Sequence, residues 1–456
     1  MILRDYQTAL IEGTRAEYAA GHKSVLAVLP TGGGKTVIFC SIARSAAALG
    51  KTVIMIMHRH QLIRQTSAAL DGTPHGIIRA GTKPDPTQRL QIASVGTLAN
   101  RTEQYKPDLL IFDEAHHCTA ASYAQIVEAY PTARVLGVTA TPCRTDGTGL
   151  HTAGFQTLIE GPTTAELTAV GYLSPAHVFA PCQIDVKGVK SERGDFAKGA
   201  LTEACDTPQI TGNAIDHYRQ HCNRQPAIAF CVSVRHADHV AEQFKGVGYN
   251  AAAIHGRHTD EERAAMITDL GAGRLDVLTS CELISEGVDV PVVSCGIMLR
   301  PTQSKALALQ QMGRVLRTAP GKPHATILDH AGNCKRHGVP TSPQEWTLEG
   351  SKRKAGETPM PITTCGECFY VHPVAPRCPN CGHEYTSDAR EVQTVQGELE
   401  RIDVDKVAAQ QRREIRRREQ KQARTLTDLI ALGKARGYAP GWAHQIHKAR
   451  GRYRRT

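Results

Sequence analysis

A glycine-rich stretch near the start of the chain combines residue types that bind phosphate. Residues 29–36 read LPTGGGKT and lie where an apolar strand ends and a helical pattern begins. Glycine N–H groups and a helix N-terminus attract anions, a lysine there reaches the β and γ oxygens, and the next hydroxyl ligates Mg²⁺. The alternative is a turn that only joins strand to helix, and Leu29 replaces the usual first glycine. The stretch predicts an ATP site formed by Thr31, Gly32, Gly33, Gly34, Lys35 and Thr36.

A second stretch supplies the carboxylates that phosphoryl transfer needs. Residues 109–116 read LLIFDEAH, an apolar strand that ends in two acids. Asp113 at the strand end could hold Mg²⁺ through water, and Glu114 could orient or deprotonate the attacking water. The alternative is the start of a solvated loop. Because the acids follow the glycine-rich stretch by about 80 residues, as the two halves of such sites do, we predict Lys35, Asp113 and Glu114 as catalytic and Thr36 and Asp113 as Mg²⁺ ligands.

The surrounding chain must place both stretches at one edge of a sheet. Short apolar runs predict strands at 25–29, 52–57, 91–94, 109–113 and 135–139, and helical spacing predicts helices at 35–49, 59–70 and 115–129. The pattern repeats from Pro208, with strands predicted at 227–231, 251–254, 276–279, 292–299 and 325–329. Such alternation is typical of parallel α/β sheets. We therefore predict two tandem lobes, at residues 1–160 and 161–335.

Composition and charge limit the class of protein. The chain has 456 residues, of which 41% are hydrophobic and 21% charged, so it is long enough for about three globular domains. It contains no apolar run of the roughly 18 residues that a membrane helix needs, and its start lacks a secretory signal. These features predict no membrane partner and a cytoplasmic protein, associated with the nucleoid of a bacterial or phage-infected cell.

Further motifs give the chain a family resemblance over most of its first 330 residues. In order they are LRDYQ (3–7), MHR (57–59), SVGTL (94–98), GVTATP (137–142), AFCVS (229–233), IHG (254–256), SEGVDVP (285–291) and QQMGRVLR (310–317). Together with the two stretches above, they resemble the superfamily 2 helicases of the DEAH type. Within that superfamily LRPT (299–302) and ILD (327–329) are most similar to RadD-type bacterial proteins and phage helicases.

The resemblance implies two RecA-like lobes and a role for each matching residue. At the ATP site it implies Arg4, Gln7, Gly287 and Asp289, with Gln310, Arg314 and Arg317 as catalytic residues. For coupling hydrolysis to lobe movement it implies His116, Thr139 and Thr141. For nucleic-acid contact it implies Arg59, Gly96, Thr97, Ser233, His255, Gly256 and Ser280.

Two of these arginines also have a physical interpretation of their own. Arg314 and Arg317 are three positions apart on a predicted helix and would share one face. Two guanidinium groups on one face could reach γ-phosphate charge across a cleft between the lobes, as arginine fingers do. A surface face of salt bridges is the alternative, and Gly313 favours close approach.

Four of the 14 cysteines form a candidate metal site. Cys365, Cys368, Cys378 and Cys381 make two CxxC units, and four thiolates at this spacing suit tetrahedral Zn²⁺. Iron of the rubredoxin type is the main competitor, whereas a redox dithiol needs only one unit. We predict a linker at 336–361 and a zinc ribbon at 362–386, whose four protein ligands favour a structural role. Contact of the ribbon with nucleic acid stays open.

The C-terminal segment carries the excess charge. Residues 400–456 hold 16 Lys or Arg against 6 Asp or Glu, which accounts for the net charge of +10. We predict a basic helical tail at 387–456, with a charged helix at 402–432. Its basic groups suit phosphate contacts and its aromatic rings suit base stacking, and the candidates are Arg413, Arg417, Tyr438 and Trp442. A solvated charge run, or a tryptophan packed in a helical hairpin, is the alternative.

These features predict a motor that hydrolyses ATP and moves along or unwinds nucleic acid. DNA is favoured over RNA, and replication or repair proteins are expected partners. One alternative is the motor subunit of a restriction-type nuclease, but the nearest acidic triplets, at 185–187 and 419–421, lack an acidic partner. The other is a non-enzymatic zinc-ribbon DNA-binding module, which the paired phosphate and Mg²⁺ motifs oppose.

Overall fold

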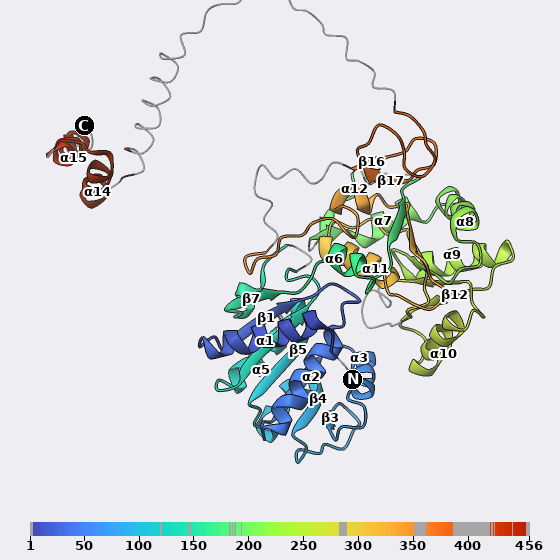
Figure 1. Cartoon of the computed structure of the whole chain (residues 1–456), viewed down its shortest axis with the longest axis horizontal. Helices are drawn as coiled ribbons and strands as arrows, with labels where there is room; N and C mark the ends of the chain where they lie inside the picture. The colour runs from blue at the N-terminus through green and yellow to red at the C-terminus, as the bar shows by residue number, and fades with distance from the viewer. Residues whose placement is uncertain are drawn as a thin grey trace, which may run out of the picture. The chain divides into compact units, whose positions relative to one another are not determined.

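A computed structural model describes most of the chain, in two compact units. The described residues are 3–118, 121–144, 147–181, 184, 186, 188–192, 194–281, 290–350, 362–385, 420, 423, 425–439 and 441–452. The first unit spans Met1–Tyr385 and the second Thr386–Thr456, and each is described by itself (Figure 1).

The first lobe is built on a seven-stranded sheet in which all strands are parallel. In sheet order the strands are β3 (Gly76–Ile78), β4 (Leu90–Ser94), β2 (Val53–Met57), β5 (Leu109–Asp113), β6 (Arg134–Thr139), β1 (Ser24–Val28) and β7 (Thr157–Glu160). The central strands are buried on both faces, as the continuous apolar runs predict.

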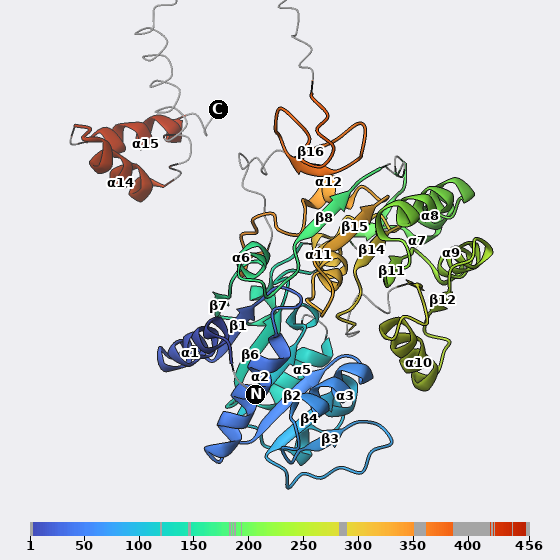
Figure 2. The same ribbon diagram turned by 45° about the vertical axis from the view of Figure 1, so that its right-hand side comes forward.

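Helices cover both faces of this sheet because alternate strand residues point to opposite sides. Val25 and Ala27 pack with α1 (Asp5–Ala19), α2 (Lys35–Ala48) and α3 (His60–Ala69). Leu26 and Val28 belong to the opposite core, with α4 (Val95–Ala99) and α5 (Ala121–Ala129). The lobe therefore has three layers, as Figure 2 shows.

The second lobe repeats this design with six parallel strands. Their order is β12 (Ala251–Ile254), β13 (Val277–Ser280), β11 (Ala227–Phe230), β14 (Cys295–Met298), β15 (Ala325–Asp329) and β8 (Ala176–Phe179). One face packs on α8 (Pro208–Cys222) and α9 (Val234–Gly246). The other packs on α7 (Lys198–Cys205), α10 (Asp260–Gly271), α11 (Lys305–Val315) and α12 (Asn333–His337).

Two parallel α/β lobes are thus confirmed, but one predicted helix is wrong. Residues 115–129 do not form one helix: a 3₁₀ turn spans Ala115–His117, and α5 begins separately at Ala121. The reason is Glu114, whose φ of 49° lies in the left-handed region and turns the chain sharply. The strands β3, β7 and β8 were not predicted. Each is an edge strand of three or four residues, too short to give a clear pattern.

The segment after α12 packs across the first lobe in its described part. We call residues 338–350 the strap. Trp346 and Leu348 lie against the core of the first lobe, and the Leu348 carbonyl accepts a 2.9 Å hydrogen bond from the His151 N–H. Gly350 forms a β-bridge with Thr148. The strap therefore joins the end of the second lobe back to the first, within the segment predicted as a linker.

Two small modules complete the chain. A hairpin of β16 (Ile362–Thr364) and β17 (Val371–Pro373) carries the first CxxC unit in its turn, and the second unit follows β17. In the second unit α14 (Leu426–Arg436) packs on α15 (Trp442–Arg452). Among the described helices, none has the length and apolarity to span a bilayer.

Candidate functional site

The strand order of the first lobe sorts the predicted residues into two groups. The three adjacent strands β5, β6 and β1 lead into Asp113, Thr139 and the 29–36 stretch. The neighbouring pair β4 and β2 leads into Gly96 and Arg59. Because parallel strands end at one edge of the sheet, the nucleotide residues gather on one half of that edge and the nucleic-acid candidates on the other.

The glycine-rich stretch forms a tight loop that opens α2. Gly32 and Gly34 have φ of 86° and 85°, and Gly34 caps the helix in the left-handed conformation. A Cβ at Gly34 would lie 2.5 Å from Nε2 of Gln7. The loop therefore needs glycine for its backbone conformation and for close approach, and it leaves N–H groups at the helix start for an anion.

Lys35 at the end of this loop lies close to the two acids that end β5, Asp113 and Glu114. Lys35 Nζ lies 3.8 Å from Glu114 Oε1, and both side chains are about nine-tenths buried. The Glu114 N–H donates to Asp113 Oδ1 at 3.0 Å. The backbone of Glu114 lies in the left-handed region, with a φ of 49°. Such strain persists only where the surroundings impose it and is common at functional sites.

Burial raises the pKa of Asp113, and the neighbouring Glu114 raises it further, while Lys35 and Arg314 oppose the shift. The two adjacent buried carboxylates face one lysine and one arginine, so these four charges balance, and the phosphates of a nucleotide would bring negative charge that they leave unneutralised. A divalent cation would neutralise it, and the hydroxyl of Thr36 and the carboxylate of Asp113 are hard oxygen donors of the kind that Mg²⁺ prefers. The donor set therefore fits MgATP.

The second lobe closes over the loop, although not as predicted. Helix α11 ends at Val315, so Arg314 and Arg317 do not share one helix, and that prediction is wrong. Arg317 instead pairs with Leu173 in a β-bridge, because the Ser174 N–H bonds the Leu316 carbonyl at 2.7 Å and draws the chain out of the helix. Arg314 stays buried on α11, close enough to Asp113 to lower the pKa of that carboxyl.

Contacts across the lobes still bring the end of α11 and Arg317 to the loop. A Cβ at Gly313 would lie 2.7 Å from Cβ of Thr31, and one at Gly32 would lie 3.4 Å from Cγ of Arg317. Gly313 thus permits the close approach that its position suggested.

A partly buried lysine, which the sequence did not suggest, holds the end of α11. Lys322 Nζ donates to the carbonyls of Val315 and Arg317, both at 2.6 Å. Burial, and then the charge of Arg317, lowers the pKa of Lys322 to about 8. Lysine is favourable at a helix C-terminus because it satisfies carbonyls that have no helical partner.

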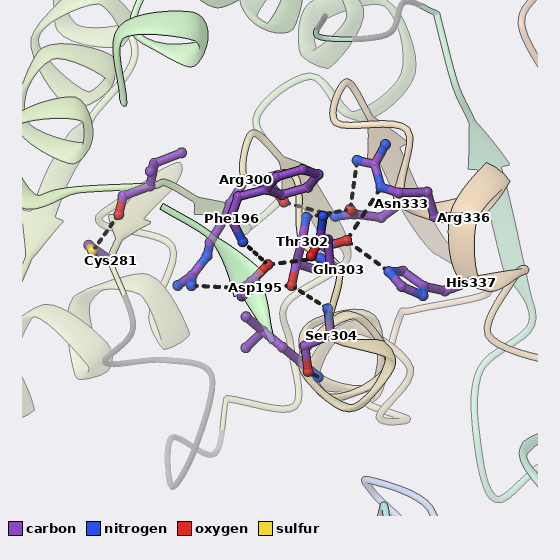
Figure 3. A network of polar contacts seen from close by, with 12 residues as sticks. Asp195, Phe196, Cys281, Arg300, Thr302, Gln303, Ser304, Asn333, Arg336 and His337 are labelled. Atoms are coloured by element: carbon purple, nitrogen blue, oxygen red, sulfur yellow. Dashed lines mark hydrogen bonds and ion pairs between the residues drawn. The ribbon is translucent and has the colours of Figure 1, made fainter. Parts of the chain in front are cut away.

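A polar network fixes the start of α11 (Figure 3). Asp195 accepts hydrogen bonds from Thr302 Oγ1 at 2.9 Å and from the Gln303 N–H at 2.7 Å, and it pairs with Arg300 at 3.3 Å. Asn333 donates to the Arg300 carbonyl at 2.9 Å. The residues 299–302 that carried the family likeness therefore orient the helix that bears Gln310 and Arg314.

The predicted adenine residues lie beside an aromatic contact between the lobes. The Arg4 N–H donates to Gln7 Oε1 at 3.0 Å, and the Tyr6 hydroxyl donates to the Gly33 carbonyl at 2.8 Å. Tyr172 of the second lobe lies 5.7 Å from the Tyr6 ring and stacks under the Arg4 guanidinium at 4.0 Å. Tyr172 was not predicted, and its position 166 residues from Tyr6 gives no sequence signal.

The predicted coupling residues form one hydrogen-bonded set. The Thr139 hydroxyl donates to the Thr141 carbonyl at 3.0 Å, so His116 Nδ1, 3.2 Å from Thr139 Oγ1, must be the donor. The same nitrogen lies 3.5 Å from Glu114 Oε2. Gln310 reaches Thr141 from the second lobe at 3.5 Å. The set therefore joins the Glu114 carboxylate to both lobes.

The nucleic-acid candidates lie at strand ends in both lobes. Arg59 follows β2, Gly96 and Thr97 lie in α4, Ser233 caps α9, and His255 and Gly256 follow β12. Ser280 lies at the end of β13 and is buried, so other residues of the chain cover the side chain that was predicted to contact nucleic acid.

Three histidines, His58, His117 and His116, connect Arg59 to the Glu114 carboxylate. Arg59 Nε donates to His58 Nε2 at 3.2 Å. The His58 and His117 ring centroids are 4.5 Å apart, and those of His117 and His116 are 4.2 Å apart. This chain of contacts ends at Glu114, and the sequence gave no sign of it beyond the adjacent histidines.

Some predicted residues lie outside the described part of the chain. These are Gly287, Asp289, Arg413 and Arg417, with most of the helix predicted at 402–432 and the acidic residues of the triplets at 185–187 and 419–421.

The four cysteines come together as a metal site requires. Their sulfurs lie within 4.8 Å of one another, with Cys365 and Cys381 3.6 Å apart and Cys368 and Cys378 3.7 Å apart. A tetrahedron with Zn–S bonds of about 2.3 Å has S···S edges of about 3.8 Å, so the residues fit. The hairpin docks on the edge of the second lobe, where the Ala180 N–H bonds the Phe369 carbonyl at 2.9 Å.

In the second unit Trp442 packs within the helical hairpin. Its ring lies against Gly433, where a Cβ would be 3.3 Å away, and 4.4 Å from the Tyr438 ring. This is the packing alternative to base stacking, so replacing Trp442 would disturb the hairpin as well as any stacked base.

Comparisons with known proteins agree with this geometry. Residues 1–144 match the family model of the type III restriction enzyme res subunit, and residues 212–319 that of the helicase conserved C-terminal domain. The 51.5 kDa protein of a Lactococcus phage (isolate 7-9) is 32% identical over 384 residues, which cover 83% of this chain and 82% of that protein. The DNA 3'-5' translocase XPB2 of Sulfurisphaera tokodaii is 25% identical over 364 residues, which cover 69% of this chain and 78% of that protein.

A solved structure resembles the fold. A fragment of an HsdR-type subunit of a type I restriction enzyme from Vibrio vulnificus has a TM-score of 0.60 at 20% identity, over 74% of this chain and 66% of that one. At this identity the likeness concerns the fold alone. The chain spans 52% and 60% of the length of two yeast relatives.

Proposed function

This chain belongs to the superfamily 2 helicases, ATP-driven motors that act on nucleic acid, and we propose that it couples ATP hydrolysis in the cleft between its lobes to movement along DNA. The observation that carries this proposal is the convergence of the Lys35–Glu114 pair with Arg314 and Arg317 of the other lobe. Because residues of both lobes form the ATP site, the geometry of that site changes whenever the lobes move relative to each other. The finer assignment to DEAH-type, RadD-like proteins rests on residues 113–116 and 299–302.

Each group at the site has a proposed task in hydrolysis. The loop N–H groups and Lys35 bind the β and γ phosphates, and Thr36 and Asp113 would hold Mg²⁺, which supplies charge neutralisation at the phosphates. Glu114 orients and deprotonates water, while His116 and Lys35 fix the carboxylate. Arg314 and Arg317 stabilise charge as the γ-phosphoryl leaves. Gln7 and Arg4 orient adenine.

Coupling to the strand is proposed to run through the histidines. Arg59 is a phosphate contact candidate, and its hydrogen bond to His58 begins the path of ring contacts to Glu114. A strand that shifts Arg59 would thereby change the orientation of the base. DNA is preferred as the strand because the similar Sulfurisphaera protein is named a DNA translocase.

The decisive experiment measures ATPase rate with single-stranded DNA, forked DNA and RNA side by side. A DNA-stimulated rate, and displacement of one strand from the fork, would support a DNA motor that unwinds. A rate that is the same with and without every polymer would contradict the proposal.

The cysteine module is proposed to hold one structural Zn²⁺. Because metal binding supplies folding energy in so small a module, Cys368→Ser or Cys381→Ser should lose the metal and the order of the hairpin, while the lobes keep basal ATPase activity. Elemental analysis of the purified chain should find one zinc, whereas Cys281→Ser, outside the cluster, should keep it. Iron in place of zinc, or no metal, would refute the assignment.

The basic tail is proposed to add phosphate contacts. Removing residues 400–456 should weaken binding to single-stranded DNA and flatten the salt dependence, by about 0.7 in log–log slope for each lost contact. Basal ATPase activity should survive, because the lobes belong to the other compact unit. Fluorescence anisotropy at several salt concentrations measures both quantities.

A length-matched control replaces the tail arginines by glutamine, at Arg412, Arg413, Arg416, Arg417 and Arg418. It should reproduce most of the loss if charge is the cause. A truncated protein with the parent's affinity and slope would leave strand binding to the lobes alone.

A further inference from the structure

A cleft between the lobes, away from the nucleotide loop, is rich in guanidinium groups. It lies between α3 of the first lobe and α10 of the second, which face each other in Figure 1, and has a volume of about 510 Å³. Arg59, Arg64 and Arg263 line it, together with Gln61 and Gln65. Among these residues the family motif included Arg59 and Gln65, and the resemblance implied a nucleic-acid contact for Arg59.

A single carboxylate holds two of these arginines together. Asp260, on the first turn of α10, lies 3.4 Å from Arg64 Nη2 across the cleft and also pairs with Arg263 on its own helix. Asp260 is the only acidic side chain among the cleft-lining residues that the structure describes. One small anion therefore occupies the point where guanidinium groups from both lobes converge.

Carboxylate and phosphate oxygens are bound by arginine in the same way, through charge-assisted N–H···O bonds in a planar fork. A site that holds one will accept the other if the first can leave. Arg64 and Asp260 are 55% and 37% exposed, so solvent reaches the pair and its mutual attraction is modest. A polyanion that brings several phosphates at once can displace it.

We propose that this cleft binds the phosphodiester backbone of a single strand through Arg64 and Arg263, and that Asp260 is a built-in competitor that occupies the site until a strand displaces it. The proposal rests on the proposed function, since it names the strand-binding site of that motor. It also gives the strand a mechanical effect. Displacing Asp260 breaks an ion pair that joins the lobes, next to Arg59 and its path to Glu114.

The proposal predicts a gain of affinity on removal of an acid. Asp260→Asn should bind a fluorescein-labelled oligothymidylate about two- to fivefold more tightly than the parent, which is the range that an exposed ion pair is worth. Arg64→Ala and Arg263→Ala should bind more weakly, each with a log–log salt slope smaller by about 0.7. Anisotropy titrations of the full chain between about 50 and 200 mM salt measure both.

The matched control is Asp269→Asn on the same helix. Asp269 is 39% exposed and pairs with Arg274, but it does not line the cleft, so its removal changes net charge equally and should leave affinity unchanged. In a chain that carries Arg64→Ala and Arg263→Ala, adding Asp260→Asn should give no gain, because the competitor then has no arginine to release.

Two results would overturn the inference while leaving the motor intact. One is equal affinity of the Asp260 and Asp269 variants in a protein whose ATPase is stimulated by the same oligonucleotide, which would reduce Asp260 to a helix-start residue favourable to the α10 dipole. The other is a gain that persists without the two arginines. If the parent neither binds the oligonucleotide nor responds to it, the proposed function itself fails.

Discussion

The Glu114→Gln variant is expected to bind ATP with nearly unchanged affinity and to hydrolyse it about 10²- to 10⁴-fold more slowly, the range that a general base contributes. Glutamine keeps the shape of the side chain and an oxygen that faces Lys35 and His116, but it cannot take a proton from water. Titration with a fluorescent ATP analogue measures binding, and phosphate release measures turnover.

Lys35→Ala should differ from Glu114→Gln in its ATP affinity, because the ammonium group of Lys35 is proposed to contact the phosphates in the ground state as well as in the transition state. Both affinity and turnover should fall. Glu128→Gln on the exposed face of α5 is the matched control and should behave like the parent. Near-normal turnover in either site variant would remove these residues from the catalytic role.

The Arg314→Ala and Arg317→Ala variants should lose turnover by about 10³-fold or more if each acts as an arginine finger. Both residues come from the second lobe, so the contacts of the first lobe with ATP should survive and affinity should change little. Single-turnover rates with saturating ATP measure the chemical step separately from binding.

The two arginines differ in their surroundings, and the conservative variants use that difference. Arg314 is buried beside Asp113 and the lysine in Arg314→Lys keeps charge but not the planar fork, so most of the rate should still be lost. Arg317 is held by backbone contacts to Leu173 and Lys322 that its side chain does not make. Its substitution should therefore leave the fold unchanged. An effect on ATP affinity alone would argue against a finger role for either residue.

A motor built this way senses its ligands through contacts between the lobes. The lobes contact each other at three separate places: Tyr172 against Arg4, Gly313 against Thr31 and Asp260 against Arg64. These contacts lie at the proposed adenine, phosphate and strand sites respectively. The strap adds a further contact, because Trp346 packs against the core of the first lobe. Changes in how the lobes meet can therefore link nucleotide and strand, beside the proposed path of histidine contacts from Arg59 to Glu114 within the first lobe.

The sequence by itself determined the parts that depend on local chemistry. An apolar strand followed by Gly32, Gly33, Gly34 and Lys35 specifies a phosphate loop because the backbone freedom of glycine and the helix start lie within a few residues. The acids after β5 and the paired CxxC units are local in the same sense. The repeated strand–helix alternation determined two parallel sheets, since each segment carries its own period.

Only the tertiary structure decided which of these parts meet. The end of α11 at Val315 depends on Leu173 pairing with Arg317, and the break after Glu114 depends on a left-handed residue that its side-chain type does not announce. Three contacts join residues that are far apart along the chain. Tyr172 contacts Tyr6 over a separation of 166 positions, His117 contacts His58 over 59, and Asp260 pairs with Arg64 over 196. Contacts at such separation are set by how helices and sheets pack around the cores, and a pattern read along one chain records spacing within an element but not the packing between elements.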